Sequence, residues 1–161
     1  MSTTQSNLKL DTEIRNALLG LSEIKPIEHM IDCDADPMIP DGWSIEKHIK
    51  GGKFRWIKDQ VLLFLSRKQM SGKVIGGHDL RQELADKPVL NACVLDYLLK
   101  NPHLIPEEWK GKVVSFWGTV YRNGGVLCVR YLYWNRNRWY WGYDYLDNGW
   151  IEYKPAAVCV G

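Results

Sequence analysis

Residues Trp134–Trp150 read W-N-R-N-R-W-Y-W-G-Y-D-Y-L-D-N-G-W, and aromatic residues hold alternate positions within them: Trp139, Trp141, Tyr143 and Tyr145. Alternate side chains of a β-strand lie on one face, so these four rings are expected to share a face that packs inward. The intervening residues are Arg138, Tyr140, Gly142, Asp144 and Leu146. We expect this second face to meet solvent. Tyr, Gly, Asn and Asp are typical of binding surfaces, where tyrosine supplies contact area and the small polar residues supply adaptable hydrogen bonds.

The residues around this stretch predict an antiparallel sheet. From Lys112 the hydrophobic period changes to two, which predicts strands at about 113–121, 126–134 and 138–146, and a short final strand at 157–160. Asn123-Gly124 and Asn135–Asn137 are hairpin signals, and such short connections join antiparallel neighbours. Residues 111–161 are therefore expected to form an aromatic-rich meander of three to four strands.

The first 110 residues predict helices. We expect a loose leader over 1–10 and a helical region over 11–110, with helices at 12–21, from Ser44 to Gly51, and at 53–69, 78–86 and 91–100. A sheet with one apolar face needs a covering layer, and these helices can supply it. The predicted fold class is α+β, with N-terminal helices packed on the C-terminal meander in one cooperative domain.

Charge is distributed unevenly along a chain of ordinary globular composition, 45% hydrophobic and 25% charged with a net charge of +2. Residues 47–82 hold nine basic and two acidic groups, whereas residues 1–46 hold three basic and nine acidic ones. The two segments could face each other within the fold, or the basic one could bind nucleic acid. The candidate contacts of this basic segment are Lys47, Lys50, Lys53, Arg55, Lys58, Arg67 and Lys68.

The remaining motifs argue against an enzyme or a metalloprotein. Four cysteines are widely spread without a C-x-x-C pair or an export signal, which predicts reduced thiols in a cytoplasmic protein. No metal site or cofactor is expected, and no apolar run is long enough for a membrane helix. A Cys–His nucleophilic pair could assemble in space, but no flanking sequence indicates one.

Two groups of motifs resemble known sequences. Val89–Ala92, Leu104–Gly111, Phe116–Thr119 and Val129–Trp134 resemble a group of small uncharacterised bacterial proteins, over about residues 89–158. The tail W-x-W-x-Y-x-x-L-D-x-x-W, which starts at Trp139 and is followed by P-A-A-V, is similar to variable regions of diversity-generating retroelement proteins. Members of that family usually carry a C-type-lectin-like fold, whose usual motifs are missing here.

The second resemblance implies a diversified surface. In that family an asparagine-rich template is copied with errors at adenines, so Asn codons change at fixed positions between framework residues. Applied to this sequence, it implies exchange at Tyr140, Gly142, Asp144, Asn148, Gly149, Ile151 and Tyr153. Trp139, Trp141, Tyr143 and Trp150 would be framework residues that hold the sheet.

Together these patterns predict a non-enzymatic protein that binds an unknown protein or small ligand. The expected contacts are Asn135, Asn137, Tyr140, Asp144, Asn148, Ile151, Glu152 and Tyr153. One alternative is nucleic-acid binding by the basic segment. A further alternative is a carbohydrate-binding aromatic platform, in which rings beside arginines stack on a ligand.

Overall fold

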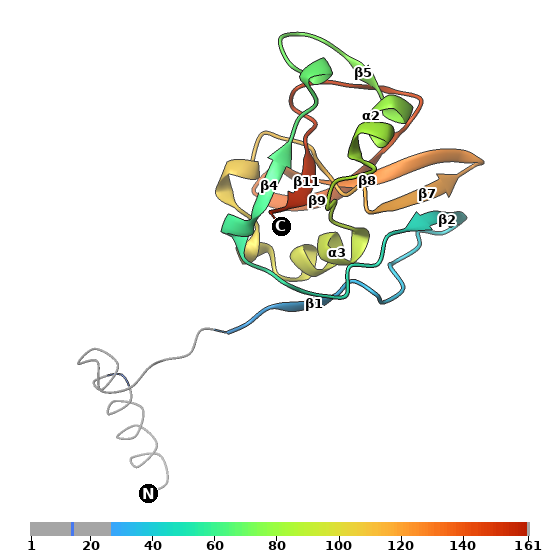
Figure 1. Ribbon diagram of the computed structural model, residues 1–161. Helices are drawn as coiled ribbons and strands as arrows, with labels where there is room; N and C mark the ends of the chain where they lie inside the picture. Colours follow the sequence, from blue (N-terminus) through green and yellow to red (C-terminus); the bar gives the residue numbers. More distant parts are fainter. Residues whose placement is uncertain (1–13, 15–26, 161) are drawn as a thin grey trace, which may run out of the picture.

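A computed structural model describes Ile14 and residues 27–160, and strands dominate this part of the chain (Figure 1). The architecture is a curled, mixed seven-stranded sheet with two α-helices, so the predicted α+β arrangement of N-terminal helices packed on a C-terminal meander is wrong. The predicted leader over 1–10 and helix over 12–21 lie outside the described residues, apart from Ile14.

The long strand β8 (Val126–Asn135) is the centre of the sheet. One of its edges pairs with β9 (Arg138–Tyr145), from Cys128 opposite Tyr145 to Asn135 opposite Arg138. Its other edge pairs first with β7 (Thr119–Asn123) and then with β6 (Val114–Ser115). The two-residue turn between β8 and β9 has positive φ angles of 49° at Arg136 and 68° at Asn137, as a tight hairpin requires. The predicted strands 126–134 and 138–146 are confirmed to within one residue.

Strands from the first half of the chain complete the same sheet. The edge strand β2 (Trp43–His48) pairs antiparallel with β7. At the other end, β11 (Ala156–Cys159) runs parallel to β6 and antiparallel to β4 (Val61–Phe64). The predicted strand 157–160 is confirmed, but the predicted meander is wrong because β2, β4 and the parallel β6–β11 pair belong to the same sheet.

The helices predicted from Ser44 and over 53–69 are absent from the described structure. The chain there forms β2, β3 (Lys53–Arg55), the 3-10 turn η1 (Lys58–Gln60), β4 and the 3-10 turn η2 (Arg67–Gln69). The apolar residues from Phe54 to Leu65 fit a helical stripe, but Val61–Phe64 instead pairs with Ala156–Cys159. Distant backbone pairing has overridden the local period.

The predicted helices 78–86 and 91–100 are confirmed as α2 (Gly77–Leu84) and α3 (Ala92–Lys100). Asn91 caps α3, since its side chain accepts a hydrogen bond of 3.0 Å from the backbone N–H of Cys93. Two further antiparallel strand pairs lie outside the main sheet: β1 (Met30–Asp32) with β3, and β5 (Ile75–Gly76) with β10 (Gly149–Trp150). Two short turns, η3 (Pro102–Leu104) and η4 (Glu107–Trp109), follow α3.

The two helices belong to two core clusters that involve opposite faces of β8. The first cluster joins the buried side of α3 to Leu132, and the second joins Leu80 and Leu84 of α2 to Val129. Leu132 and Val129 differ by an odd number of positions, so their side chains lie on opposite sides of the strand. No described helix is long and apolar enough to cross a membrane.

Candidate binding surface

The inner face of β9 carries the predicted aromatic row. Trp139 and Trp141 are half-buried and pack against the α3 core cluster, as predicted. Tyr145 is half-buried, and Tyr143 is 40% exposed. Trp141 also covers the fully buried guanidinium of Arg130, whose central carbon lies 4.3 Å from the ring centroid. The row is therefore a core face at its tryptophan end and a surface at Tyr143.

The opposite face of the β8–β9 hairpin carries three tyrosines that the α2 cluster does not cover, and a fourth lies near them in the loop after β10. We call this group the tyrosine face: Tyr131, Tyr133, Tyr140 and Tyr153. The rings of Tyr131 and Tyr133 lie 5.7 Å apart, and those of Tyr133 and Tyr140 stack at 5.7 Å and 27°. Burial raises the pKa of Tyr131, and the nearby Asp144, Tyr133 and Tyr153 add to this shift.

Gly142 leaves room for one ring of the tyrosine face. It lies opposite Tyr131 across the ladder, and a Cβ atom built on Gly142 would lie 2.7 Å from atoms of the Tyr131 ring. The ring of Tyr131 thus packs directly over the glycine backbone, which a side chain at residue 142 would prevent. The sequence suggested that position 142 is exchangeable, whereas the structure gives it a packing role.

Asp144 pairs with neighbouring side chains instead of facing solvent. Its carboxylate accepts hydrogen bonds of 2.6 Å from Lys154 Nζ and 2.8 Å from Asn148 Nδ2. The ion-paired side chains of Asp144 and Lys154 are only 11% and 17% exposed. The expectation of a solvent-facing Asp144 was therefore wrong, because Lys154 folds back over it from the following loop.

The loop that carries Ile151, Glu152 and Tyr153 has a fixed backbone. The buried Gln69 donates hydrogen bonds from Nε2 to the carbonyl oxygens of Ile151 (3.1 Å) and Lys154 (3.0 Å). Gln69 Oε1 accepts from the Ser66 N–H at 3.0 Å, which completes a capping box around η2. Glu152 and Tyr153 remain exposed on this anchored loop, and Ile151 is half-buried. Sequence reasoning missed Gln69, although the spacing Ser66-x-x-Gln69 is a capping-box signal.

The other predicted contacts lie at the two ends of β9. Asn135 and Asn137 are exposed at the hairpin tip, and Asn148 is exposed in the turn beyond the strand. Asn137 also lines a pocket of about 360 Å³ together with Trp134 and Trp139. The structure therefore divides the predicted contacts into two groups. One group lies along β9 and the loop after it: Tyr140, Asp144, Asn148 and Tyr153. Asn135 and Asn137 lie apart from it, at the tip of the hairpin.

The basic segment does not form the helix that the sequence predicted. All seven of its candidate residues are exposed, but they are divided among β2, the following loop, β3, η1 and η2. Arg55 forms an ion pair of 3.0 Å with Glu28. Nucleic-acid binding by these residues stays a prediction, without a helix to present them.

One cysteine and one histidine do come together. Cys93 Sγ, in the first turn of α3, lies 3.9 Å from His48 Nε2. His48 Nε2 also lies 3.1 Å from the carbonyl oxygen of Cys33, which can only accept a hydrogen bond, so Nε2 carries a proton. Burial, aided by nearby aspartates, raises the pKa of Cys93 to about 11. The pair therefore lacks both a free base and a thiolate, the two features of an activated nucleophile.

The described residues contain no group of three or more His, Cys, Asp or Glu side chains placed to hold a metal ion. Comparison with known proteins found no matching family model, no similar curated protein and no similar solved structure.

Proposed function

We propose that this chain is a non-enzymatic binding protein whose tyrosine face contacts a protein or a small ligand. The observation that carries the proposal is the partial exposure of four tyrosines on one surface with a fixed backbone. Tyr140 is 36% exposed and Tyr153 is 49% exposed, whereas the underlying Gly142 and Asp144 are held by packing and ion pairing.

The physical chemistry of tyrosine supports this proposal. A tyrosine ring buries a large area on binding, and it loses little conformational freedom because it has two rotatable side-chain angles. On this surface part of that freedom is already lost, since Tyr131 rests on Gly142 and Tyr133 stacks on Tyr140. Side chains held in place before binding lower the entropic cost of association.

The surroundings favour a ligand with both apolar and polar groups. At one end Arg138 lies beside Tyr140, with its guanidinium carbon 6.0 Å from the ring centroid. At the other end are the exposed side chains of Asn148 and Glu152. This polar rim around an aromatic centre resembles the general anatomy of protein interfaces. The stacked pair Tyr133–Tyr140 also keeps the carbohydrate alternative open, because sugars pack against aromatic rings.

A diversified surface is part of the same proposal, in a narrower form than the sequence suggested. Tyr140, Asn148 and Tyr153 are exposed and Ile151 is half-buried, so these four positions are the proposed sites of exchange. Gly149 is left out because a Cβ atom built on it would lie 2.5 Å from Val74 Cγ1. Gly142 and Asp144 are assigned to the framework because exchange there would disturb the Tyr131 ring or the pairing with Lys154.

The experiment is an amide NMR titration of the full chain with panels of peptides and of oligosaccharides. We expect saturable shifts at Tyr131, Tyr133, Tyr140 and Tyr153, and we expect Tyr140→Ala combined with Tyr153→Ala to abolish them. Tyr143→Ala is the matched control, since Tyr143 is an equally exposed tyrosine on the other face of β9. Saturable shifts that avoid the tyrosine face, or that survive in the double variant, would refute the proposal.

A further inference from the structure

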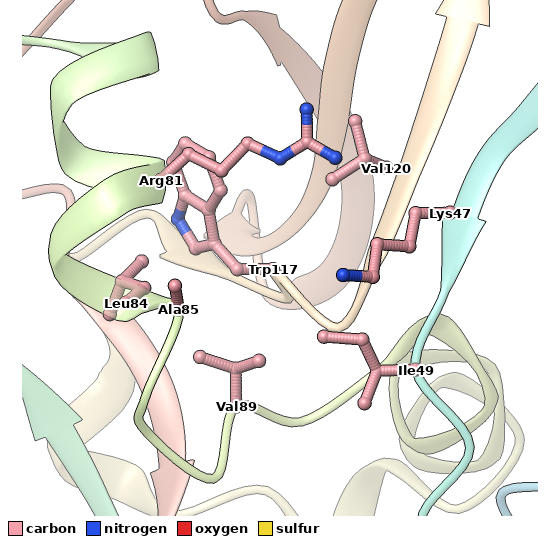
Figure 2. A pocket seen from close by; sticks show the side chains of 8 residues that line it. All are labelled: Lys47, Ile49, Arg81, Leu84, Ala85, Val89, Trp117 and Val120. Atoms are coloured by element: carbon pink, nitrogen blue, oxygen red, sulfur yellow. The ribbon is translucent and has the colours of Figure 1, made fainter.

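A second pocket, which shares no lining residue with the tyrosine face, lies between α2 and β2 (Figure 2). Its volume is about 80 Å³, enough for a ligand of a few heavy atoms. Two cationic side chains, Lys47 from β2 and Arg81 from α2, line it together with six apolar ones, and none of the lining residues is acidic. Figure 2 shows the Lys47 ammonium group and the Arg81 guanidinium extending over this hollow from its two sides.

Neither Lys47 nor Arg81 forms an ion pair within the described residues. Within residues 27–160 no carboxylate lies within 4.0 Å of either one, whereas Arg55, Arg122 and Lys154 each hold an acidic partner. An anion placed between these two cations would be attracted by both, and the lining offers no acidic residue that would oppose it.

The floor of the pocket indicates what the rest of the ligand is. It is formed by apolar groups that include Trp117 and Val120, and Trp117 is 3% exposed with an indole N–H that has no hydrogen-bond partner. Ile49 and Val89 line this pocket and also a neighbouring apolar pocket of about 330 Å³, so the two hollows adjoin. An inorganic ion would leave this apolar wall uncovered, whereas a short hydrocarbon chain would bury it.

We propose that this pocket binds a small amphipathic monocarboxylate. The carboxylate lies between Lys47 and Arg81, and its short apolar tail packs on Trp117 and extends towards Ile49 and Val89. A guanidinium suits this head group because its planar fork can donate two parallel hydrogen bonds to one carboxylate. The proposal is independent of ligand binding at the tyrosine face.

The test is an NMR titration of the full chain with acetate, butyrate, hexanoate and inorganic phosphate at constant ionic strength. We expect saturable shifts at the Ile49, Val89 and Val120 amides and at the Trp117 indole, with affinity rising about fourfold per methylene that enters the pocket. Phosphate should bind more weakly than hexanoate. Equal affinities for acetate and hexanoate, tighter binding of phosphate than of hexanoate, or no saturable shift at these groups would overturn the proposal.

Two charge-removing variants locate the head group. Lys47→Met and Arg81→Met should each weaken hexanoate binding by about tenfold or more, because each removes one charge facing the carboxylate. Arg67→Met is the matched control, since Arg67 is an exposed cation of η2 outside the pocket. Lys47→Gln and Arg81→Gln provide a second pair that keeps a polar tip, and amide spectra check that each variant is folded. Unchanged hexanoate affinity in both cation variants would show that the carboxylate binds elsewhere.

Discussion

The substitution Asp144→Asn gives the sharpest test of the structure, because the sequence treats position 144 as exchangeable and the structure does not. The change keeps the size of the side chain and removes its charge. Lys154 Nζ lies 2.6 Å from the Asp144 carboxylate and is only 17% exposed, so the variant leaves an ammonium group with little water and no counter-charge. Removing one partner of a buried ion pair costs about 3–5 kcal/mol.

Some solvent still reaches this pair, so we expect a loss just below that range, about 2–3 kcal/mol. With a urea m-value of about 2 kcal/mol/M, the midpoint of unfolding should fall by about 1–1.5 M. Asp147→Asn is the matched control, because Asp147 pairs with His78 on the surface and is 69% exposed. That variant should change stability by no more than about 0.5 kcal/mol.

The double variant Asp144→Asn with Lys154→Met completes the test. Replacing the lysine removes the uncompensated ammonium, so the double variant should be more stable than Asp144→Asn alone. An unchanged urea midpoint for Asp144→Asn would refute the buried pairing and would restore position 144 to the exchangeable surface.

Four further outcomes are expected. Trp141→Ala should lower the free energy of unfolding by about 3 kcal/mol in a urea titration, because it opens a cavity over the buried Arg130; an unchanged midpoint would mean that Trp141 does not cover the core. Burial raises the pKa of the Cys93 and Cys128 thiols from 9.0 to about 11 and that of Cys33 to about 12. In a Cys159→Ser background, a thiol reagent at about pH 8 should therefore react roughly a hundredfold faster with the unfolded chain than with the folded one. Because folding raises these pKa values, the stability that the thiols contribute is fully present below pH 9 and is lost as the pH rises towards 11–12. Urea titrations at a series of pH values would show this loss, and an unfolding free energy that does not change over this pH range would contradict the burial of the thiols. If the basic segment binds nucleic acid, mobility shifts at about 50 mM salt should weaken steeply at about 200 mM, and the absence of any shift at the lower salt would exclude this function.

The hairpin and the two α-helices could be predicted from sequence because their signals are local. The period of two across Trp139–Tyr145, the turn at Arg136-Asn137 and the Asn91 cap each act over a few residues. The inward orientation of Trp139 and Trp141 follows from the same alternation. The tyrosine at position 140 was selected by the same reasoning, although its partners Tyr131 and Tyr133 were not.

The tertiary structure alone decided the rest of the sheet and the composition of the site. The residues from Phe54 to Leu65 have a period compatible with a helix, and only the distant strand Ala156–Cys159 selected strand pairing for Val61–Phe64. Likewise, nothing near Asp144 in the sequence shows that Lys154 covers it, and nothing near Lys47 shows that Arg81 faces it. Local sequence determines periodicity and turns, whereas burial and charge pairing depend on which distant segments the folded chain brings into contact.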